Sequence, residues 1–141
     1  MSTDNAETVR RIYEQWSRGD FSTVEAYHPE IEFEMPDWPE GSSARGVEGM
    51  NRAWRAALGA WDDFRAEADE LIEADQNVIV TVNRLQASGK GSGAPVEART
   101  ACVWTFAAGK VVRLALYWNV ARALEVAGVR GGEQRRPPAD G

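Results

Sequence analysis

The sequence predicts an α+β domain in which a curved antiparallel sheet wraps around N-terminal helices. Helical periodicity is concentrated before about residue 61, whereas most of the later chain alternates in the manner of strands and contains turn signals. The length of 141 residues suits one domain with a core and room for a pocket. A sheet closed in this way by helices forms a cone, and its mouth is the expected ligand site.

The first helix is predicted between about residues 4 and 18. Asp4, followed three residues later by Glu7, resembles a capping box, and Gly19 is typical of the position just beyond a helix C-terminus. Between these ends runs one apolar stripe at helical spacing, consisting of Val9, Ile12, Tyr13 and Trp16.

A short helix, a strand and a loop are predicted next. Ser22 with Glu25 favours a helix that ends before Pro29, because the residue before a proline avoids the helical region. Residues 31–35 alternate between apolar and acidic side chains, which indicates a strand with one buried face. Residues 36–43 are rich in proline, glycine and serine and are predicted to form a loop.

A third helix is predicted from about residue 47 to residue 61, followed by four strands. Its apolar stripe consists of Val47, Met50, Trp54, Leu58 and Trp61. The strands are expected near residues 64–74, 77–86, 96–106 and 111–117, with turn residues between them. The second of these strands is apolar on both faces, so it should lie centrally and be covered on both sides.

A short last helix is predicted after Asn119, a favourable N-cap, and should stop at Gly128. The residues beyond it lack apolar periodicity and are predicted to be disordered. We therefore expect a flexible segment at residues 1–5, one domain at residues 6–130 and a tail at residues 131–141.

The composition argues against several classes of function. There are 16 Lys and Arg against 22 Asp and Glu, a net charge of −6, so we expect neither nucleic acid nor a membrane surface as a partner. One cysteine and one histidine allow no intramolecular disulfide and no Cys/His metal cluster, and they fit a cytoplasmic protein without metal or cofactor. The polar N-terminus and the absence of an apolar run of roughly 18 residues predict no signal peptide and no membrane span.

Several features occur in a recognisable order along residues 6–130. A helix is followed by Gly19 and Asp20, a strand ends at Met35 and Pro36, and residues 106–112 read Phe-Ala-Ala-Gly-Lys-Val-Val. Together with the segments at residues 9–36, 44–82 and 100–130, they resemble the SnoaL-like and ketosteroid isomerase-like branch of the nuclear-transport-factor-2-like superfamily. The resemblance implies the cone-like fold and a homodimer formed through the outer sheet face. It implies no single activity, because that superfamily includes enzymes and non-enzymatic members.

The catalytic residues of the ketosteroid isomerases do not carry over. The positions that correspond to their Tyr and two Asp residues are occupied here by Ile12, Met35 and Cys102. An enolate mechanism of that kind would therefore lack its base and its acids.

The pocket wall implied by the resemblance is retained. Tyr27, Trp54 and Trp118 stand where isomerases carry aromatic residues. The predicted lining also includes residues on inward-facing stripes, namely Ile12, Trp16, Phe33, Met35, Leu58 and Trp104. This aromatic, uncharged wall favours a small hydrophobic or aromatic molecule as the partner.

Three polar residues are candidate hydrogen-bond donors in such a pocket. Tyr13 lies one residue beyond the isomerase Tyr position, about 100° around the helix, so it either donates into the cavity from a rotated helix or belongs to the core. Asn83 is either a polar contact in the cavity or a strand-end amide bonded to backbone. Cys102 is either a small buried residue or a nucleophile, and the second role requires a neighbour that lowers its pKa.

His28 and Asp37 are the candidate proton acceptors. His28 either lines the mouth of the cone or is a surface or capping histidine. Asp37 lies in the predicted loop at the rim, where a carboxylate could reach a ligand. Two functions stay open: an isomerase, cyclase or hydrolase acting on a carbonyl or polyketide-like ligand, and a non-enzymatic dimeric ligand-binding or interaction module. A buried ionisable group with a pKa near 7 would favour the enzyme.

Overall fold

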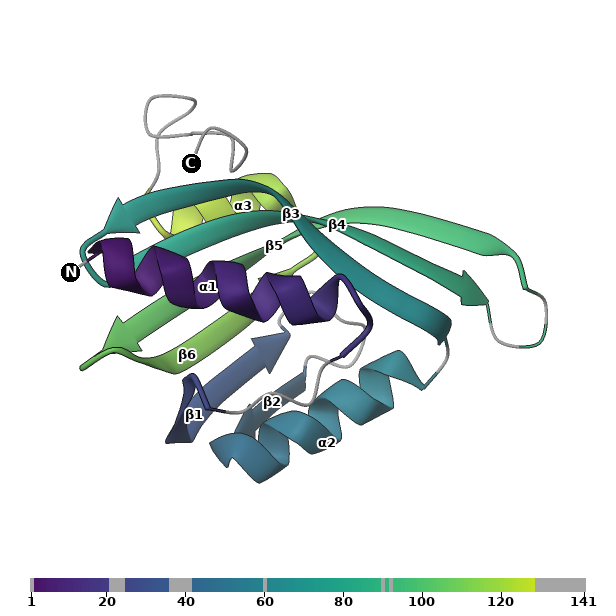
Figure 1. Cartoon of the computed structure of the whole chain (residues 1–141), viewed down its shortest axis with the longest axis horizontal. Helices are drawn as coiled ribbons and strands as arrows, with labels where there is room; N and C mark the ends of the chain where they lie inside the picture. Colours follow the sequence, from purple (N-terminus) through teal and green to yellow (C-terminus); the bar gives the residue numbers. More distant parts are fainter. Residues whose placement is uncertain are drawn as a thin grey trace.

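The computed structural model describes residues 2–20, 25–35, 42–59, 61–89, 91 and 93–128. The elements follow one another as α1 (Ser2–Trp16), β1 (Tyr27–Met35), β2 (Ser42–Arg45), α2 (Gly46–Leu58), β3 (Trp61–Asp75), β4 (Val78–Gly89), β5 (Pro95–Ala107), β6 (Lys110–Tyr117) and α3 (Val120–Val126) (Figure 1).

The six strands form one sheet in the order β2-β1-β6-β5-β4-β3. Strands β3 to β6 form the predicted antiparallel meander, and β1 pairs antiparallel with β2. The neighbouring strands β1 and β6 are parallel, so the sheet is mixed, and the prediction of a purely antiparallel sheet was wrong at this point. The chain leaves β1, crosses to the far edge at β3 and reverses three times, which returns β6 beside β1 in the same direction.

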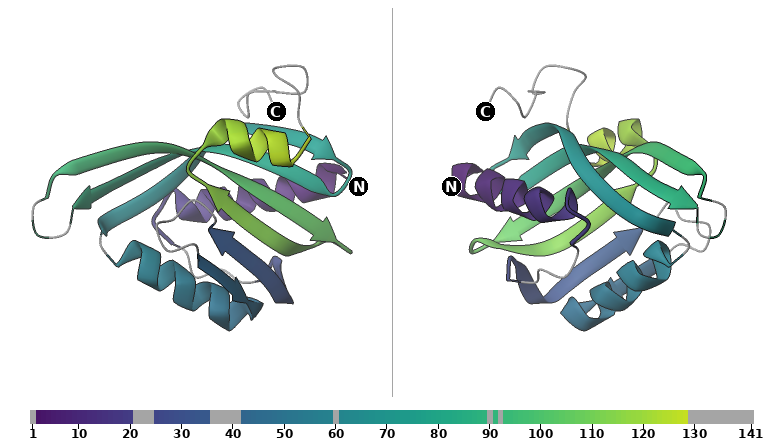
Figure 2. Two further views of the ribbon diagram at one scale, coloured as in Figure 1. Left: turned by 180° about the vertical axis from the view of Figure 1, so that it is seen from behind. Right: turned by 45° about the vertical axis from the view of Figure 1, so that its right-hand side comes forward.

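The sheet is strongly curved and carries helices on both faces (Figures 1 and 2). Helix α1 packs along β3 on the concave side, and α2 packs against β1 and β2. Helix α3 lies on the opposite face, against β4, β5 and β6. The structure thus confirms the predicted α+β cone.

Two apolar clusters lie on the two faces of this sheet. The inner cluster fills the space between the sheet and helices α1 and α2. The outer cluster lies under α3 and consists of Ile72, Val80, Val82, Ala101, Val103, Ala115, Tyr117 and Ala123. Strand β4 contributes to both, with Ile79 inside and Val80 outside, which confirms that it is covered on both faces. It is an interior strand but not a central one, because only β3 lies between it and the sheet edge.

The predicted short helix before Pro29 is not formed where the structure describes it. Tyr27 and His28 belong to strand β1, and Tyr27 pairs with Val111 of β6. Residues 21–24 of the predicted helix lie outside the described residues. Long-range pairing with β6 therefore overrides the local capping signal.

Strand β2 lies in a segment that was predicted to be a loop. It has the sequence Ser-Ser-Ala-Arg, and it is an edge strand because it pairs with β1 alone, with Ala44 opposite Phe33. Helix α2 ends at Leu58, ahead of Gly59, so Trp61 opens β3 and does not extend the helical stripe.

The two ends of the described chain differ in how they match the prediction. Helix α1 begins at Ser2, so Asp4 lies inside the helix and residues 2–5 form its first turn. The buried Asn5 side chain donates to the carbonyl oxygen of Gln76 (3.2 Å), which ties α1 to the turn between β3 and β4.

At the other end Asn119 caps α3 as predicted, accepting from the Arg122 N–H (3.0 Å), and residues 131–141 lie outside the described residues. No helix in the described part of the chain has the length and apolar character needed to span a bilayer.

Gly46→Ala is expected to destabilise the fold, whereas Gly49→Ala in the same helix is not. Gly46 joins β2 to α2 with φ +81°, and an added Cβ would lie 3.4 Å from the Pro29 carbonyl oxygen. The left-handed conformation costs a non-glycine residue about 1–2 kcal/mol. At Gly49 the added Cβ meets Ala44 Cβ at 3.5 Å, an ordinary contact, and alanine favours the helix. Urea unfolding of both variants checks this, and equal stability of the two would contradict it.

Candidate functional site

Five aromatic side chains meet in the inner cluster, and we call them the aromatic cluster: Tyr13 and Trp16 of α1, Phe33 of β1, Trp54 of α2 and Trp104 of β5. The ring centroid of Trp16 lies 4.9 Å from that of Tyr13, 5.4 Å from that of Trp54 and 5.5 Å from that of Trp104. Phe33 and Trp54 are 5.4 Å apart. These rings join both inner helices to the sheet and give the cone an aromatic interior.

A hydrogen-bonded network crosses this aromatic interior, and we call it the Tyr13 network: Tyr13, Thr81, Asn83, Thr100, Cys102 and Trp104. The Trp104 indole N–H donates to Thr81 Oγ1 (2.9 Å), and Thr81 Oγ1 lies 2.7 Å from the Tyr13 hydroxyl oxygen. The Tyr13 hydroxyl in turn donates to Asn83 Oδ1. The other end of the amide, Asn83 Nδ2, donates to Thr100 Oγ1 (3.2 Å) and to Cys102 Sγ (3.3 Å). All six residues are buried.

The register of β4 and β5 explains why these side chains meet. Thr81 lies opposite Cys102 and Asn83 lies opposite Thr100, so the inward-facing positions of the two strands form adjacent pairs. The network is therefore a consequence of strand alternation, completed by one residue from α1.

Helix α1 is turned so that Tyr13 faces the network. Ile12, at the isomerase Tyr position, is also buried but lines a separate cleft of about 270 Å³ with Arg11, Gln15 and Lys110. The Tyr13 hydroxyl therefore lies within the inner cluster, where its partners are the buried side chains of Thr81 and Asn83.

Burial keeps the ionisable members of the network protonated. It raises the pKa of Tyr13 well above its usual range, and it raises the pKa of Cys102 from 9.0 to about 12, against a smaller lowering by the hydrogen bond from Asn83. Burial also raises the pKa of Tyr27. Cys102 is thus a buried thiol and not an activated nucleophile. The network offers neutral donors and acceptors at pH 7.

A surface groove of about 200 Å³ between α1 and β3 reaches the edge of this site. The buried side chains of Tyr13 and Leu71 line it together with Ala68, and the exposed residues Arg10 and Glu14 lie along it. Tyr13 is therefore the member of the network that also faces this groove.

The structure brings together three of the five predicted polar residues: Tyr13, Asn83 and Cys102. His28 lies away from them on β1, where its Nδ1 accepts from the Glu30 N–H (3.0 Å), a local contact of the capping kind. Asp37 lies outside the described residues.

Most of the predicted lining residues lie in the inner cluster. Tyr27 and Met35 are buried there beside the aromatic cluster. Trp118 is 40% exposed and stands outside both apolar clusters, because it lies between β6 and α3. The side chain of Leu58 is outside the described part of the structure.

Sequence reasoning missed Thr81 and Thr100 as members of the site. Both lie on the inward face of their strands, two residues from Asn83 and Cys102 respectively, so strand alternation was an available signal. Trp104 was predicted as a wall residue only, although its N–H is the first donor of the network.

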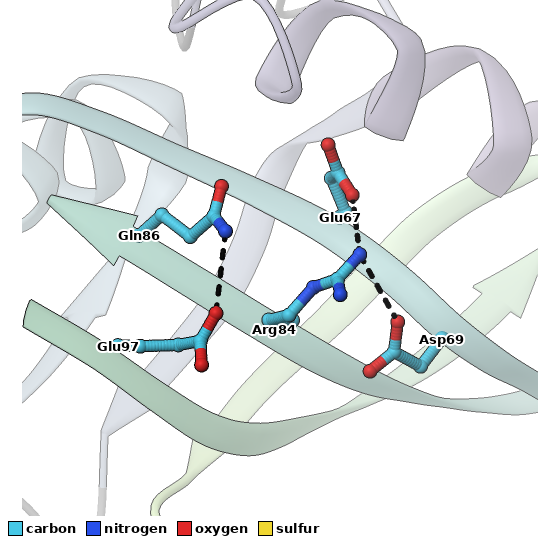
Figure 3. A network of polar contacts seen from close by, with 5 residues as sticks. All are labelled: Glu67, Asp69, Arg84, Gln86 and Glu97. Carbon is cyan, nitrogen blue, oxygen red and sulfur yellow. Dashed lines mark hydrogen bonds and ion pairs between the residues drawn. The ribbon is translucent and has the colours of Figure 1, made fainter.

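Polar and charged residues of β3, β4 and β5 pair across the strands (Figure 3). Arg84 lies 2.8 Å from Glu67 and 3.7 Å from Asp69, and Gln86 donates to Glu97 (3.2 Å). Arg84 of β4 therefore forms a cross-strand ion pair with β3. Because these groups are solvent-exposed, the pairs contribute little to stability.

The described side chains were also compared with the ligand sets that metal ions require. Among the side chains that the structure describes, no group of three His, Cys, Asp or Glu residues is arranged to hold one. The polar atoms of the Tyr13 network are hydroxyls, an amide and a protonated thiol, which suit hydrogen bonding to a neutral molecule.

Comparison with known proteins gives a family model and several similar folds. The model described as the SnoaL-like domain matches residues 9–114. No curated protein gives a significant match. A solved NTF2-like protein of unknown function from Burkholderia pseudomallei is similar with a TM-score of 0.71 and 22% identity, over 88% of this chain and 97% of that chain.

Two further solved structures have a similar fold. A candidate SnoaL-like polyketide cyclase from Jannaschia sp. gives a TM-score of 0.70 at 17% identity, over 81% of this chain and 84% of that one. A protein of ketosteroid isomerase-like fold from Catenulispora acidiphila gives 0.64 at 11% identity, over 88% and 94%. At these identities the likeness concerns the fold alone.

The raised pKa values predict that the protein loses stability in alkali. Because the folded state holds protons on Cys102 and Tyr13 that the unfolded chain releases, the free energy of unfolding should be flat near neutral pH and fall as the pH rises above about 9. Each such group contributes a slope of up to about 1.4 kcal/mol per pH unit. Cys102→Ser keeps a hydrogen-bonding atom but does not titrate there, so its slope between pH 9 and 10 should be shallower. Identical slopes in urea unfolding would show that the thiol is not shielded.

Proposed function

The chain belongs to the SnoaL-like domain family, and from that premise we propose that it binds a small, flat, largely apolar molecule whose oxygen atom hydrogen-bonds with the Tyr13 network. The observation that carries the proposal is the burial of neutral hydrogen-bonding groups inside an aromatic interior. Ligand sites commonly combine an apolar wall with a few converging polar groups.

The aromatic cluster supports a flat ligand. Its edge-to-face and tilted contacts, such as Trp16 against Trp54 at 73°, present both ring faces and ring edges to a neighbouring molecule. A planar ring system can stack or pack edge-on against such side chains, and it would bury its apolar surface where the cone already excludes water.

The network supports recognition of an oxygen atom. In an apolar interior a buried donor without a partner costs about 1–3 kcal/mol. A ligand whose oxygen accepts a hydrogen bond from such a donor is therefore favoured over a ligand that leaves the donor unpaired. Tyr13 is the member that lies both in the network and beside the groove between α1 and β3, so it is the proposed contact.

The same geometry supports binding better than proton transfer. The buried polar residues in the described part of the chain are Asn5, Thr81, Asn83 and Thr100, whose side chains do not titrate near neutral pH. An isomerase or cyclase acting on a carbonyl is the second candidate, since Tyr13 could polarise that carbonyl. It would need Asp37 or His28 as proton acceptor, and His28 Nδ1 already accepts from Glu30.

Titration with planar ketones such as 1-tetralone and phenols such as 2-naphthol should change the tryptophan fluorescence, because Trp16, Trp54 and Trp104 lie in the inner cluster. Tyr13→Phe should weaken binding of such probes about two- to tenfold through loss of one hydrogen bond.

Tyr117→Phe is the matched control, because Tyr117 is equally buried but lies in the outer cluster. It should leave the affinity unchanged. If no probe changes the fluorescence, or if both variants weaken binding alike, the proposed site is wrong.

A further inference from the structure

We infer that the side-chain amide of Asn83 holds the Tyr13 hydroxyl proton in the free protein and, by rotating half a turn, releases that proton to a carbonyl oxygen of the ligand. The inference rests on the proposed function and specifies the ligand as one whose oxygen only accepts hydrogen bonds. Asn83 is then a positioning residue, because it acts through Tyr13.

The protons of the network without ligand can be assigned from its donors and acceptors. The Trp104 N–H can only donate, so Thr81 Oγ1 accepts from it. The Tyr13 hydroxyl has one proton and gives it to Asn83 Oδ1, which has none to give. Thr81 must therefore donate to the Tyr13 oxygen in their 2.7 Å contact. The protons of the Trp104 indole, the Thr81 hydroxyl and the Tyr13 hydroxyl are therefore all donated within the network. The Tyr13 hydroxyl has no proton left for a ligand.

Rotation of the amide reverses this assignment at the end that faces Tyr13. The amide nitrogen and oxygen exchange places, so that nitrogen now donates to the Tyr13 oxygen, which also accepts from Thr81. The Tyr13 proton is then free to point to a ligand oxygen.

The far end of the amide accommodates the same rotation. Thr100 Oγ1 and Cys102 Sγ both lie within hydrogen-bond reach of Asn83. Each carries a proton of its own, since burial keeps the Cys102 thiol protonated, so each can donate to the amide oxygen once it faces them. The two ends of an amide have nearly the same shape, so the rotation requires no repacking around this fully buried side chain.

The two orientations of the Asn83 amide leave different hydrogen-bond donors without partners. This difference is the basis of the expected preference for a ligand with a carbonyl oxygen. Without ligand the rotated arrangement leaves buried donors without partners, which is unfavourable. A ketone or quinone oxygen pairs with those donors and stabilises it, whereas a hydrocarbon of the same shape does not. The site should therefore prefer a planar carbonyl compound to its hydrocarbon analogue.

The direct test is the side-chain amide signal of Asn83 in the wild-type protein by NMR. In the free protein its protons should show nuclear Overhauser contacts to Thr100 and Cys102, and with saturating 1-tetralone these should move to the ring protons of Tyr13. Tetralin, which lacks the oxygen, should leave the free pattern. An unchanged pattern with bound 1-tetralone would overturn the inference.

Calorimetric titration of the same two compounds gives the functional readout. Wild type should bind 1-tetralone between about two- and tenfold more tightly than tetralin. Asn83→Leu removes the atom that competes for the Tyr13 proton, so this preference should be kept or raised. A preference below half the wild-type value would show that Asn83 merely holds Tyr13 in place and would overturn the inference.

Tyr13→Phe is the reference variant, and it should abolish the preference while tetralin still binds. If both compounds bind wild type equally, the amide inference fails while an apolar ligand site stands. If neither compound binds, the proposed function fails and the inference fails with it.

Discussion

The requirement that polar groups inside an apolar cone find partners there governs the rest of this structure. Helix α1 reaches the sheet through Tyr13, whose hydroxyl is held between Thr81 and Asn83 of β4. A buried hydroxyl without partners would cost the fold about 1–3 kcal/mol, so this contact fixes the rotation of α1 about its axis. The same rotation places Trp16 against Trp54 and Trp104 and thereby joins α1, α2 and the sheet.

The same constraint shapes the proposed function. A network of hydroxyls, an amide and a protonated thiol is costly in an apolar interior unless it is fully paired, and here it is paired within itself. Such a network can recognise a ligand oxygen only by exchanging one internal hydrogen bond for one to the ligand. That exchange connects the stability of the cone to its specificity, and it explains why Tyr13 and Asn83 belong to both.

The sequence predicted those parts of the fold that have a local signature. The apolar residues at 78–82 were enough to predict a strand covered on both faces, and the structure places Ile79 in the inner cluster and Val80 in the outer one. Strand β2 was missed because Ser42–Arg45 lacks the apolar alternation of a strand, although its partner β1 is close in the chain. The parallel pairing of β1 with β6 was missed because those two strands lie far apart in the chain. A prediction from the pattern of neighbouring residues cannot show which distant strands pair.

The candidate site was predictable to a similar extent and for similar reasons. Asn83 and Cys102 were separate candidates, the second through the family resemblance, and the structure brings their side chains together. The choice between the two alternatives for Tyr13 could not be made, because it depends on Thr81, 68 residues away in the chain.

A double-mutant cycle between Tyr13→Phe and Thr81→Val, measured as the free energy of unfolding, tests the central claim most directly. If the hydroxyl of Tyr13 and Oγ1 of Thr81 are partners inside the cone, the two substitutions should show a coupling of about 1 kcal/mol. Effects that add within about 0.3 kcal/mol would show that the two groups do not interact, and would contradict the network on which the account rests.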